Sequence, residues 1–201
     1  MTYPSTLNCS GTMTDILLEG VRETIGIPEK SLLERSASVF DNYLNFDSRT
    51  QDEIFNLLEK APLLYGERGS CGIAHRIGEA SFRYFLRKNG KQYSLTENSY
   101  RLLNSQQRIL FGLKQLAKFA LQNCGACIEI HEDEIKWYWQ VVANDSVPYW
   151  NRFYSHYIFG LLREFFTWTS GGRYYPMEEE TSDPSSDIYF QIAINKKPLG
   201  N

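Results

Sequence analysis

Three histidines are the side chains of this chain best suited to hold a metal or a haem. His131 lies in an acidic turn, and His75 stands beside Arg76 and Glu79 on what the pattern predicts to be a wet helix face. His156 lies one position from an apolar helical stripe. Because a haem needs an axial ligand in an apolar pocket, His156 is the best haem candidate. A partly exposed or hydrogen-bonded helix residue is its alternative interpretation.

A pair of cysteines is the second candidate for metal or redox chemistry. Cys124 and Cys127 have the spacing of a redox motif or of half a zinc site, whereas Cys9 and Cys71 are isolated in sequence. No second pair completes a tetrahedral zinc site locally. The pair also follows a predicted helix and precedes a strand, the reverse of a thioredoxin motif. We therefore expect two small, half-buried thiols and no metal.

Catalytic motifs are not evident. The sequence shows no nucleophile elbow, phosphate loop, dinucleotide fingerprint or zinc-protease motif. The run Glu178-Glu179-Glu180 is interpreted as solvated charge on an edge strand, with Glu178 and Glu180 on one face. We expect no catalytic residue and no cofactor, and the sequence favours a protein that is not an enzyme.

Bulk composition excludes several classes of partner. The 201 residues carry a net charge of −3, which argues against general binding to nucleic acid. No apolar run is long enough to span a membrane, and residues 1–13 do not resemble a signal peptide. We therefore expect a cytoplasmic protein. Aromatic residues make up 14% of the chain, which predicts either an aromatic core or an aromatic-lined pocket.

Helical periodicity occupies the first 124 residues. We expect residues 1–12 to form a flexible tail and residues 13–60 an N-terminal helical extension. The helices predicted on apolar spacing, capping residues and glycine stops cover residues 14–24, 28–46, a segment from Ser48, 65–89 and 98–124.

After Cys124 the apolar period changes to that of strands. Residues 126–131 and 135–143 alternate around an acidic hairpin, with Ile135, Trp137, Trp139 and Val141 on one face. An amphipathic helix over residues 152–168 follows, and then strands over 173–181 and 187–195. The order predicts an α+β fold, in which a helical block precedes a β-β-α-β-β module with an antiparallel sheet. We assign residues 61–197 to this domain.

The last quarter of the chain resembles the 4-vinyl reductase domain, also called a hydrocarbon-binding domain. The matching residues are Tyr157 to Leu162 in the helix, Trp168 to Arg173 at the turn, the three glutamates, and Asp187 to Ile192 in the last strand. The family's two cysteines fall on Ser182 and Phe190, so its thiol chemistry does not carry over. The resemblance implies a fold similar to haem nitric-oxide sensors and vesicle-tethering subunits, with an internal apolar cavity.

These features together predict a sensor, carrier or accessory protein that binds an apolar small molecule, such as a hydrocarbon or a tetrapyrrole. Its expected ligand-binding residues are Trp137, Trp139, Tyr154, Tyr157, Ile158, Leu161, Phe165 and Trp168. The same stripe also fits an ordinary core. The alternatives are a homodimeric scaffold, because Gly72 and Gly78 allow close helix approach, and an enzyme of tetrapyrrole metabolism, implied by the family name alone.

Overall fold

The computed structural model describes residues 10–25, 61–142, 152–180 and 188–200. The helices expected over 28–46 and from Ser48 lie outside these ranges, as does Ser182. Within them, no helix is long and apolar enough to cross a membrane.

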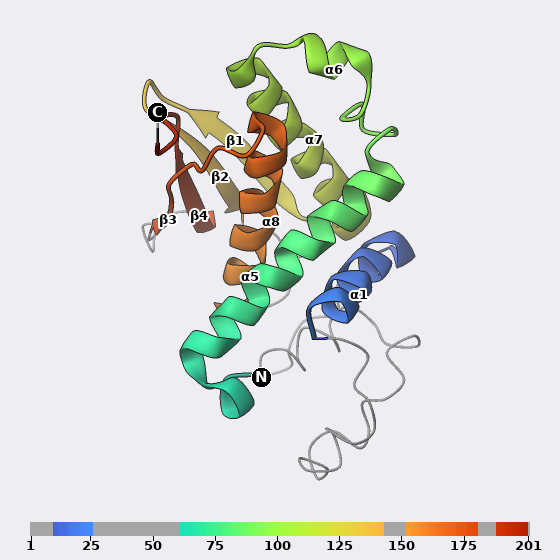
Figure 1. The fold of residues 1–201 in the computed structure, drawn as a ribbon, viewed down its shortest axis with the longest axis vertical. Coiled ribbons are helices and arrows are strands. Elements are labelled where there is room, and N and C mark those ends of the chain that lie inside the picture. Colours follow the sequence, from blue (N-terminus) through green and yellow to red (C-terminus); the bar gives the residue numbers. More distant parts are fainter. Residues whose placement is uncertain (1–9, 26–60, 143–151, 181–187, 201) are drawn as a thin grey trace.

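Two helices, α1 (Gly11–Ile25) and α5 (Ala61–Asn89), pack side by side along one flank of the molecule (Figure 1). They confirm the predicted helices over 14–24 and 65–89, each beginning three or four residues earlier than expected. Helix α5 has one break, at Gly66, whose φ of 69° lies in the region that glycine favours. It ends at Asn89, as the Asn-Gly stop predicted.

The single helix expected over 98–124 is wrong, because the chain forms two helices there. These are α6 (Asn98–Leu102) and α7 (Ser105–Cys124). Leu103 is extended, and Asn104 caps α7 by accepting a hydrogen bond from the Gln107 N–H at 2.9 Å. A capping side chain in the middle of an apolar pattern thus ends one helix and starts the next.

Four antiparallel strands form one sheet in the order β1-β2-β4-β3. They are β1 (Cys127–Glu132), β2 (Lys136–Val142), β3 (Met177–Glu180) and β4 (Ile188–Asn195). The predicted hairpin and last strand are confirmed. Strand β3 is shorter than expected, since Tyr174 makes only an isolated bridge to Leu199 and Pro176 has no N–H to donate. Ile135 is not on the inner face; it lies in the hairpin turn and is 63% exposed.

Helix α8 (Arg152–Ser170) connects the end of β2 to the start of β3 and extends two residues beyond its predicted end. Figure 1 shows α8 between the sheet and α5, with α7 beside it and α1 on the far flank of α5. The expected fold class is therefore confirmed: a helical block followed by a small antiparallel sheet with a crossing helix.

Candidate functional site

The inner face of the sheet is aromatic because strand β2 places alternate side chains on opposite sides. Trp137 and Trp139 point inward and are 1% and 2% exposed. Their neighbours Lys136 and Tyr138 point to the other face. The predicted pairing of the two tryptophans on one face of the strand is thus confirmed.

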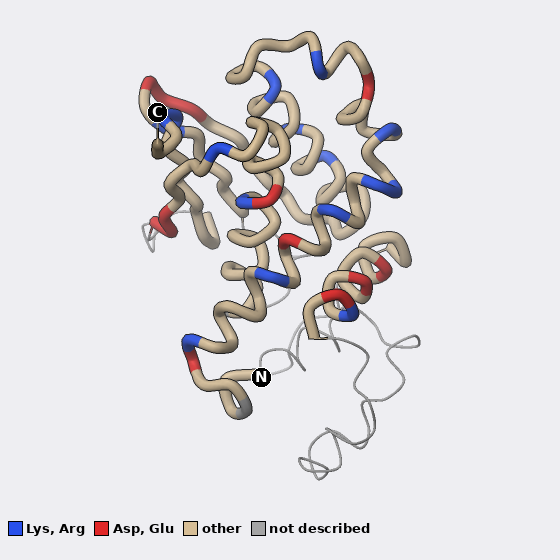
Figure 2. Tube along the Cα trace, viewed as in Figure 1, with Lys and Arg blue, Asp and Glu red and all other residues tan. Residues whose placement is uncertain are grey.

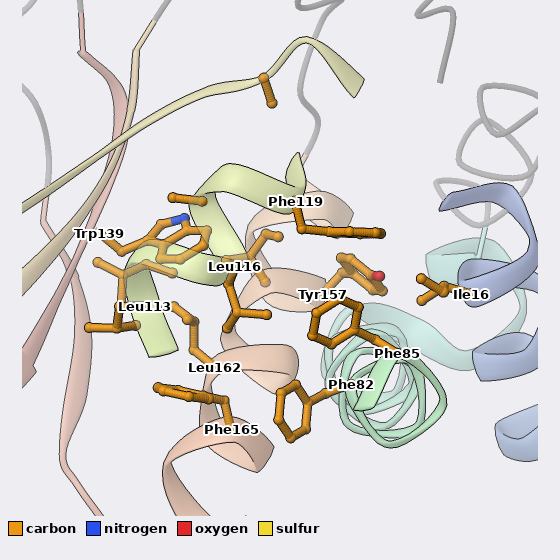
Figure 3. Close-up of a cluster of buried hydrophobic side chains, with 14 of the residues drawn as sticks. Ile16, Phe82, Phe85, Leu113, Leu116, Phe119, Trp139, Tyr157, Leu162 and Phe165 are labelled. Atoms are coloured by element: carbon orange, nitrogen blue, oxygen red, sulfur yellow. The ribbon is translucent and has the colours of Figure 1, made fainter. Parts of the chain in front are cut away.

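Helices α7 and α8 supply the other wall of this interior. Figure 3 shows Trp139 beside Leu113 and Leu116 of α7, with Leu162 and Phe165 of α8 below them. Of the predicted ligand-binding residues, Tyr157, Ile158 and Phe165 are also buried in this core cluster. We call the surface formed by β2, α7 and α8 around Trp139 the aromatic interior.

Three predicted residues occupy the margin of the cluster. Trp168 stacks on Tyr100 of α6, with ring centroids 5.7 Å apart and an interplanar angle of 9°, and it also contacts Phe82 of α5. Tyr154 and Leu161 are only partly buried. The residues of the predicted helical stripe therefore contact different elements. Helix α8 is surrounded by the sheet, by α5 and by the α6–α7 segment.

The sequence pattern did not predict two aromatic residues of the interior, Phe166 and Tyr175. Phe166 packs against Trp137 with ring centroids 5.8 Å apart, and Tyr175 packs against Phe166 at 5.1 Å. Phe166 adjoins the stripe already identified, so widening that stripe by one position includes it. Tyr175 precedes the short strand β3, and its local pattern gives no signal for burial.

One buried donor interrupts this apolar surface. Among the described residues, no acceptor takes the Trp139 Nε1–H, although the atom is shielded from solvent. An unpaired buried N–H costs about 1–3 kcal/mol, so such groups are few in folded proteins. The Trp139 N–H is therefore a hydrogen-bond donor that a ligand in the aromatic interior could use.

His156, the predicted haem candidate, faces α5 instead of the aromatic interior. Its ring lies 5.3 Å from the ring of His75, centroid to centroid. Phe159 also stacks on the His75 ring, with the ring centroids 6.0 Å apart. The expectation that His75 lies on a wet face is wrong, because α8 covers this part of α5. Burial first, and then the charge of Arg163, lower the pKa of His75 to about 4, so its imidazole is neutral at pH 7.

Glycines allow α5 and α8 to approach closely at this point. A Cβ on Gly160 would lie 2.6 Å from the carbonyl carbon of His75, and one on Gly78 would lie 2.7 Å from the Leu161 amide nitrogen. Both distances are shorter than real Cβ contacts allow. Gly78 thus serves a contact within the chain, so it no longer supports a partner chain. Gly72 faces open space.

Ion pairs flank this contact between α5 and α8, which we call the helix seam. Arg163 donates to Glu79 from Nε at 2.8 Å and also from a terminal nitrogen. Arg83 bridges two helices, binding Glu23 of α1 at 2.6 Å and Glu164 of α8 at 3.2 Å. Figure 2 shows positively and negatively charged positions along α1, α5 and α8 where these helices meet.

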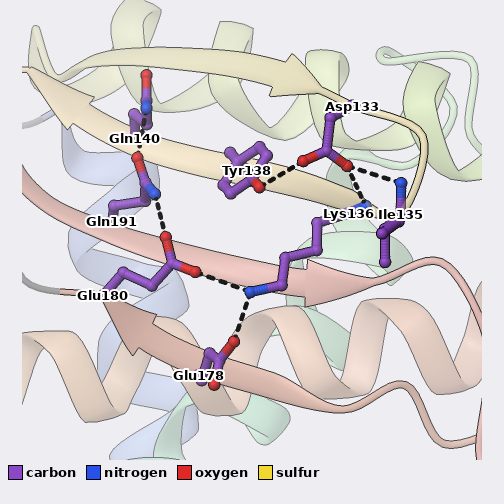
Figure 4. A network of polar contacts seen from close by, with 8 residues as sticks. All are labelled: Asp133, Ile135, Lys136, Tyr138, Gln140, Glu178, Glu180 and Gln191. Carbon is purple, nitrogen blue, oxygen red and sulfur yellow. Dashed lines mark hydrogen bonds and ion pairs between the residues drawn. The ribbon is translucent and has the colours of Figure 1, made fainter.

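The outer face of the sheet is polar and internally paired. Lys136 reaches across to Glu178 at 2.6 Å and Glu180 at 2.9 Å, which confirms that these two acids share a face (Figure 4). Asp133 closes the hairpin by accepting from the Tyr138 hydroxyl at 2.6 Å. These bonds lower the pKa of Asp133 to about 2 and raise that of Lys136. The contacts of Lys136 thus connect β2 with β3 across the strand β4 that lies between them.

Metal ligands are sparse in the part of the chain that the structure describes. No group of three or more His, Cys, Asp or Glu side chains there could hold a metal ion. Cys71 and Cys127 are free thiols. His131 is exposed and lies 2.9 Å from Glu129.

Comparison with known proteins shows the fold alone. No family model matches the sequence, and no curated protein matches it. Solved H-NOX domains do match in structure. An oxygen-binding H-NOX domain related to soluble guanylate cyclases, in its oxygen complex, has a TM-score of 0.57 at 15% identity, covering 95% of this chain and 97% of that one.

Two further H-NOX structures agree. A Cs H-NOX variant with the unnatural amino acid 4-cyano-L-phenylalanine gives a TM-score of 0.59 at 15% identity, over 95% of this chain and 98% of that one. An H-NOX variant from T. tengcongensis gives 0.55 at 15% identity, over 94% and 99%. These matches confirm the expected fold. The finer assignment to the 4-vinyl reductase family is not supported by these matches.

Proposed function

We propose that this chain binds an apolar small molecule in the aromatic interior and acts as a sensor or carrier domain. The observation that carries this proposal is the likeness of nearly the whole chain to H-NOX domains, one of which is described as oxygen-binding. The ligand would lie against Trp137 and Trp139, among the inward side chains of α7 and α8. Ligand sites of this kind are mostly apolar and contain a few polar groups that fix orientation.

Trp139 provides the polar group in this proposal. Its Nε1–H has no acceptor among the described residues, and a ligand carbonyl, carboxylate or ring nitrogen would supply one. The surrounding surface is mostly aromatic and branched aliphatic, with side chains such as Leu113, Leu116 and Phe165. The expected ligand is therefore apolar over most of its area and carries one hydrogen-bond acceptor.

Haem bound through His156 does not fit this arrangement. His156 faces α5, and the adjacent glycine contact between Gly78 and Gly160 brings the two helix backbones together. The chain's other histidines, His75 and His131, lie in the same helix seam and on the outer face of the sheet. No histidine thus reaches the aromatic interior from the described residues. The proposed ligand is therefore not a haem that one of these histidines ligates.

Calorimetric titration tests the proposal. Untagged protein is titrated with a long-chain fatty acid, a neutral hydrocarbon and metal-free protoporphyrin, which differ in size and in the acceptor they carry. Trp139→Phe keeps the ring position and removes the N–H. We expect it to weaken binding of an acceptor-bearing ligand by about 5- to 160-fold, the range that follows from losing a buried hydrogen bond of about 1–3 kcal/mol.

Trp168→Phe is the matched control, because Trp168 stacks on Tyr100 of α6. We expect it to leave the affinity unchanged. Failure of the wild-type protein to bind any of the three ligands would contradict the proposal. Equal losses in the two variants would contradict the placement at Trp139.

A further inference from the structure

His75 and His156 form a compact pair that the proposed ligand site does not use. They project from α5 and α8 toward each other, and their ring centroids are 5.3 Å apart. The rings meet at 62°, so they are not stacked face to face. The Nε2 atom of His75 is shielded from solvent and has no hydrogen-bond partner among the described residues.

The separation of the rings fits a shared metal ion. An ion bound at about 2.0–2.1 Å to one nitrogen of each ring lies about 3.2 Å from each ring centroid. With a tetrahedral angle at the ion, the two centroids are then about 5.2 Å apart. The observed 5.3 Å agrees with this value.

We propose that His75 and His156 bind a divalent transition-metal ion of the zinc and nickel class at the α5–α8 seam. Imidazole nitrogen suits these ions. Since the described residues provide no third ligand, water or a small anion completes the coordination, and the ion keeps open positions. The site is independent of the aromatic interior, which lies on another face of α8.

Charges of both signs lie beside the pair. Arg163 on α8 is the positive charge that acts on His75, and Glu79 on α5 accepts two hydrogen bonds from it. Both helices are held at this point by the contact between Gly78 and Gly160, so the two ring positions are fixed before an ion arrives.

Calorimetric titration of Zn²⁺ into the tag-free full-length chain at pH 7 tests the site. The absorption spectrum of the Co²⁺ form provides a second readout, because it reports the coordination geometry. We expect one ion per chain. His75→Gln and His156→Gln should each weaken binding by more than about 10-fold, since even the loss of an outer-shell partner costs about 10- to 100-fold.

His131→Gln is the matched control, because His131 is exposed and lies beside Glu129. Cys71→Ser checks for capture by a thiol near His75. Both should bind as the wild type does. If either histidine variant does not fold, the melting temperature of the wild type with and without Zn²⁺ still tests binding. An ion bound only to the folded chain raises its thermal stability. Absence of binding, unchanged affinity in both histidine variants, or loss in His131→Gln or Cys71→Ser would overturn the proposal.

Discussion

The close contact between α5 and α8 makes a sharp prediction for Gly160→Ala. The added Cβ would lie 2.6 Å from the carbonyl carbon and 2.7 Å from the Cα of His75. Ordinary contact begins at 3.4 Å, so the shortfall against the carbonyl carbon is 3.4 − 2.6 = 0.8 Å. Since these atoms belong to a helix backbone, the strain cannot be relieved by a side-chain rotation, and the two helices must separate.

The size of the effect follows from two opposing terms. Overpacking of an interior typically costs about 1–3 kcal/mol, and a rigid backbone contact belongs at the upper end. Alanine in place of glycine in a helix interior raises the free energy of unfolding by about 0.5–1 kcal/mol. The net loss should be about 2 kcal/mol, which corresponds to a fall in Tm of about 4–8 °C for a chain of this size.

Gly72→Ala is the matched control, because its Cβ would meet nothing within 4 Å and the residue lies in the same kind of helix interior. We expect this variant to gain about 0.5–1 kcal/mol. Urea denaturation followed by circular dichroism measures both variants. If Gly160→Ala is as stable as the wild type while Gly72→Ala behaves as expected, the helix contact described here is wrong.

Two further perturbations test the α6–α7 segment. Asn104→Ala removes the cap of α7, so the free energy of unfolding should fall by about 1 kcal/mol in urea melts; Asn104→Asp, which can still cap, should lose much less. Tyr100 should make stability fall as the pH rises, because burial raises its pKa from 10.0 to about 12, whereas the unfolded chain loses this proton near pH 10. Its contribution is fully present below pH 10 and declines by up to about 2–3 kcal/mol between pH 10 and 12. Alkaline denaturation of Tyr100→Phe should lack that decline, and an identical pH profile in this variant would contradict the assignment.

The sheet and its crossing helix were predictable because their signals are local. The change from helical to alternating periodicity at Cys124, the acidic hairpin and the turn over residues 168–173 each depend on neighbouring residues. Burial of Trp137 and Trp139 on one face followed from the same alternation. These features were enough to predict the α+β order and most element ends.

Other features depend on contacts between distant segments. The sequence gives Asn104 no clear mark as a cap inside an apolar helical pattern, so the break between α6 and α7 was missed. His75 was placed on a wet face because only its sequence neighbours, Arg76 and Glu79, were visible. Its actual environment is set by His156 and Phe159, which lie more than 80 positions later. The residues of the predicted α8 stripe have different environments for the same reason, because three other elements surround that helix.

Native mass spectrometry of freshly purified protein, combined with denaturing extraction and an absorbance scan, tests the central proposal most directly. An apolar ligand in the aromatic interior predicts a stoichiometric adduct that leaves on denaturation, from protein without a haem absorption band. A haem band that disappears in His156→Gln would contradict the assignment of His156 to the helix seam. A bare chain mass, retained after incubation with each of the three test ligands, would contradict the binding function itself.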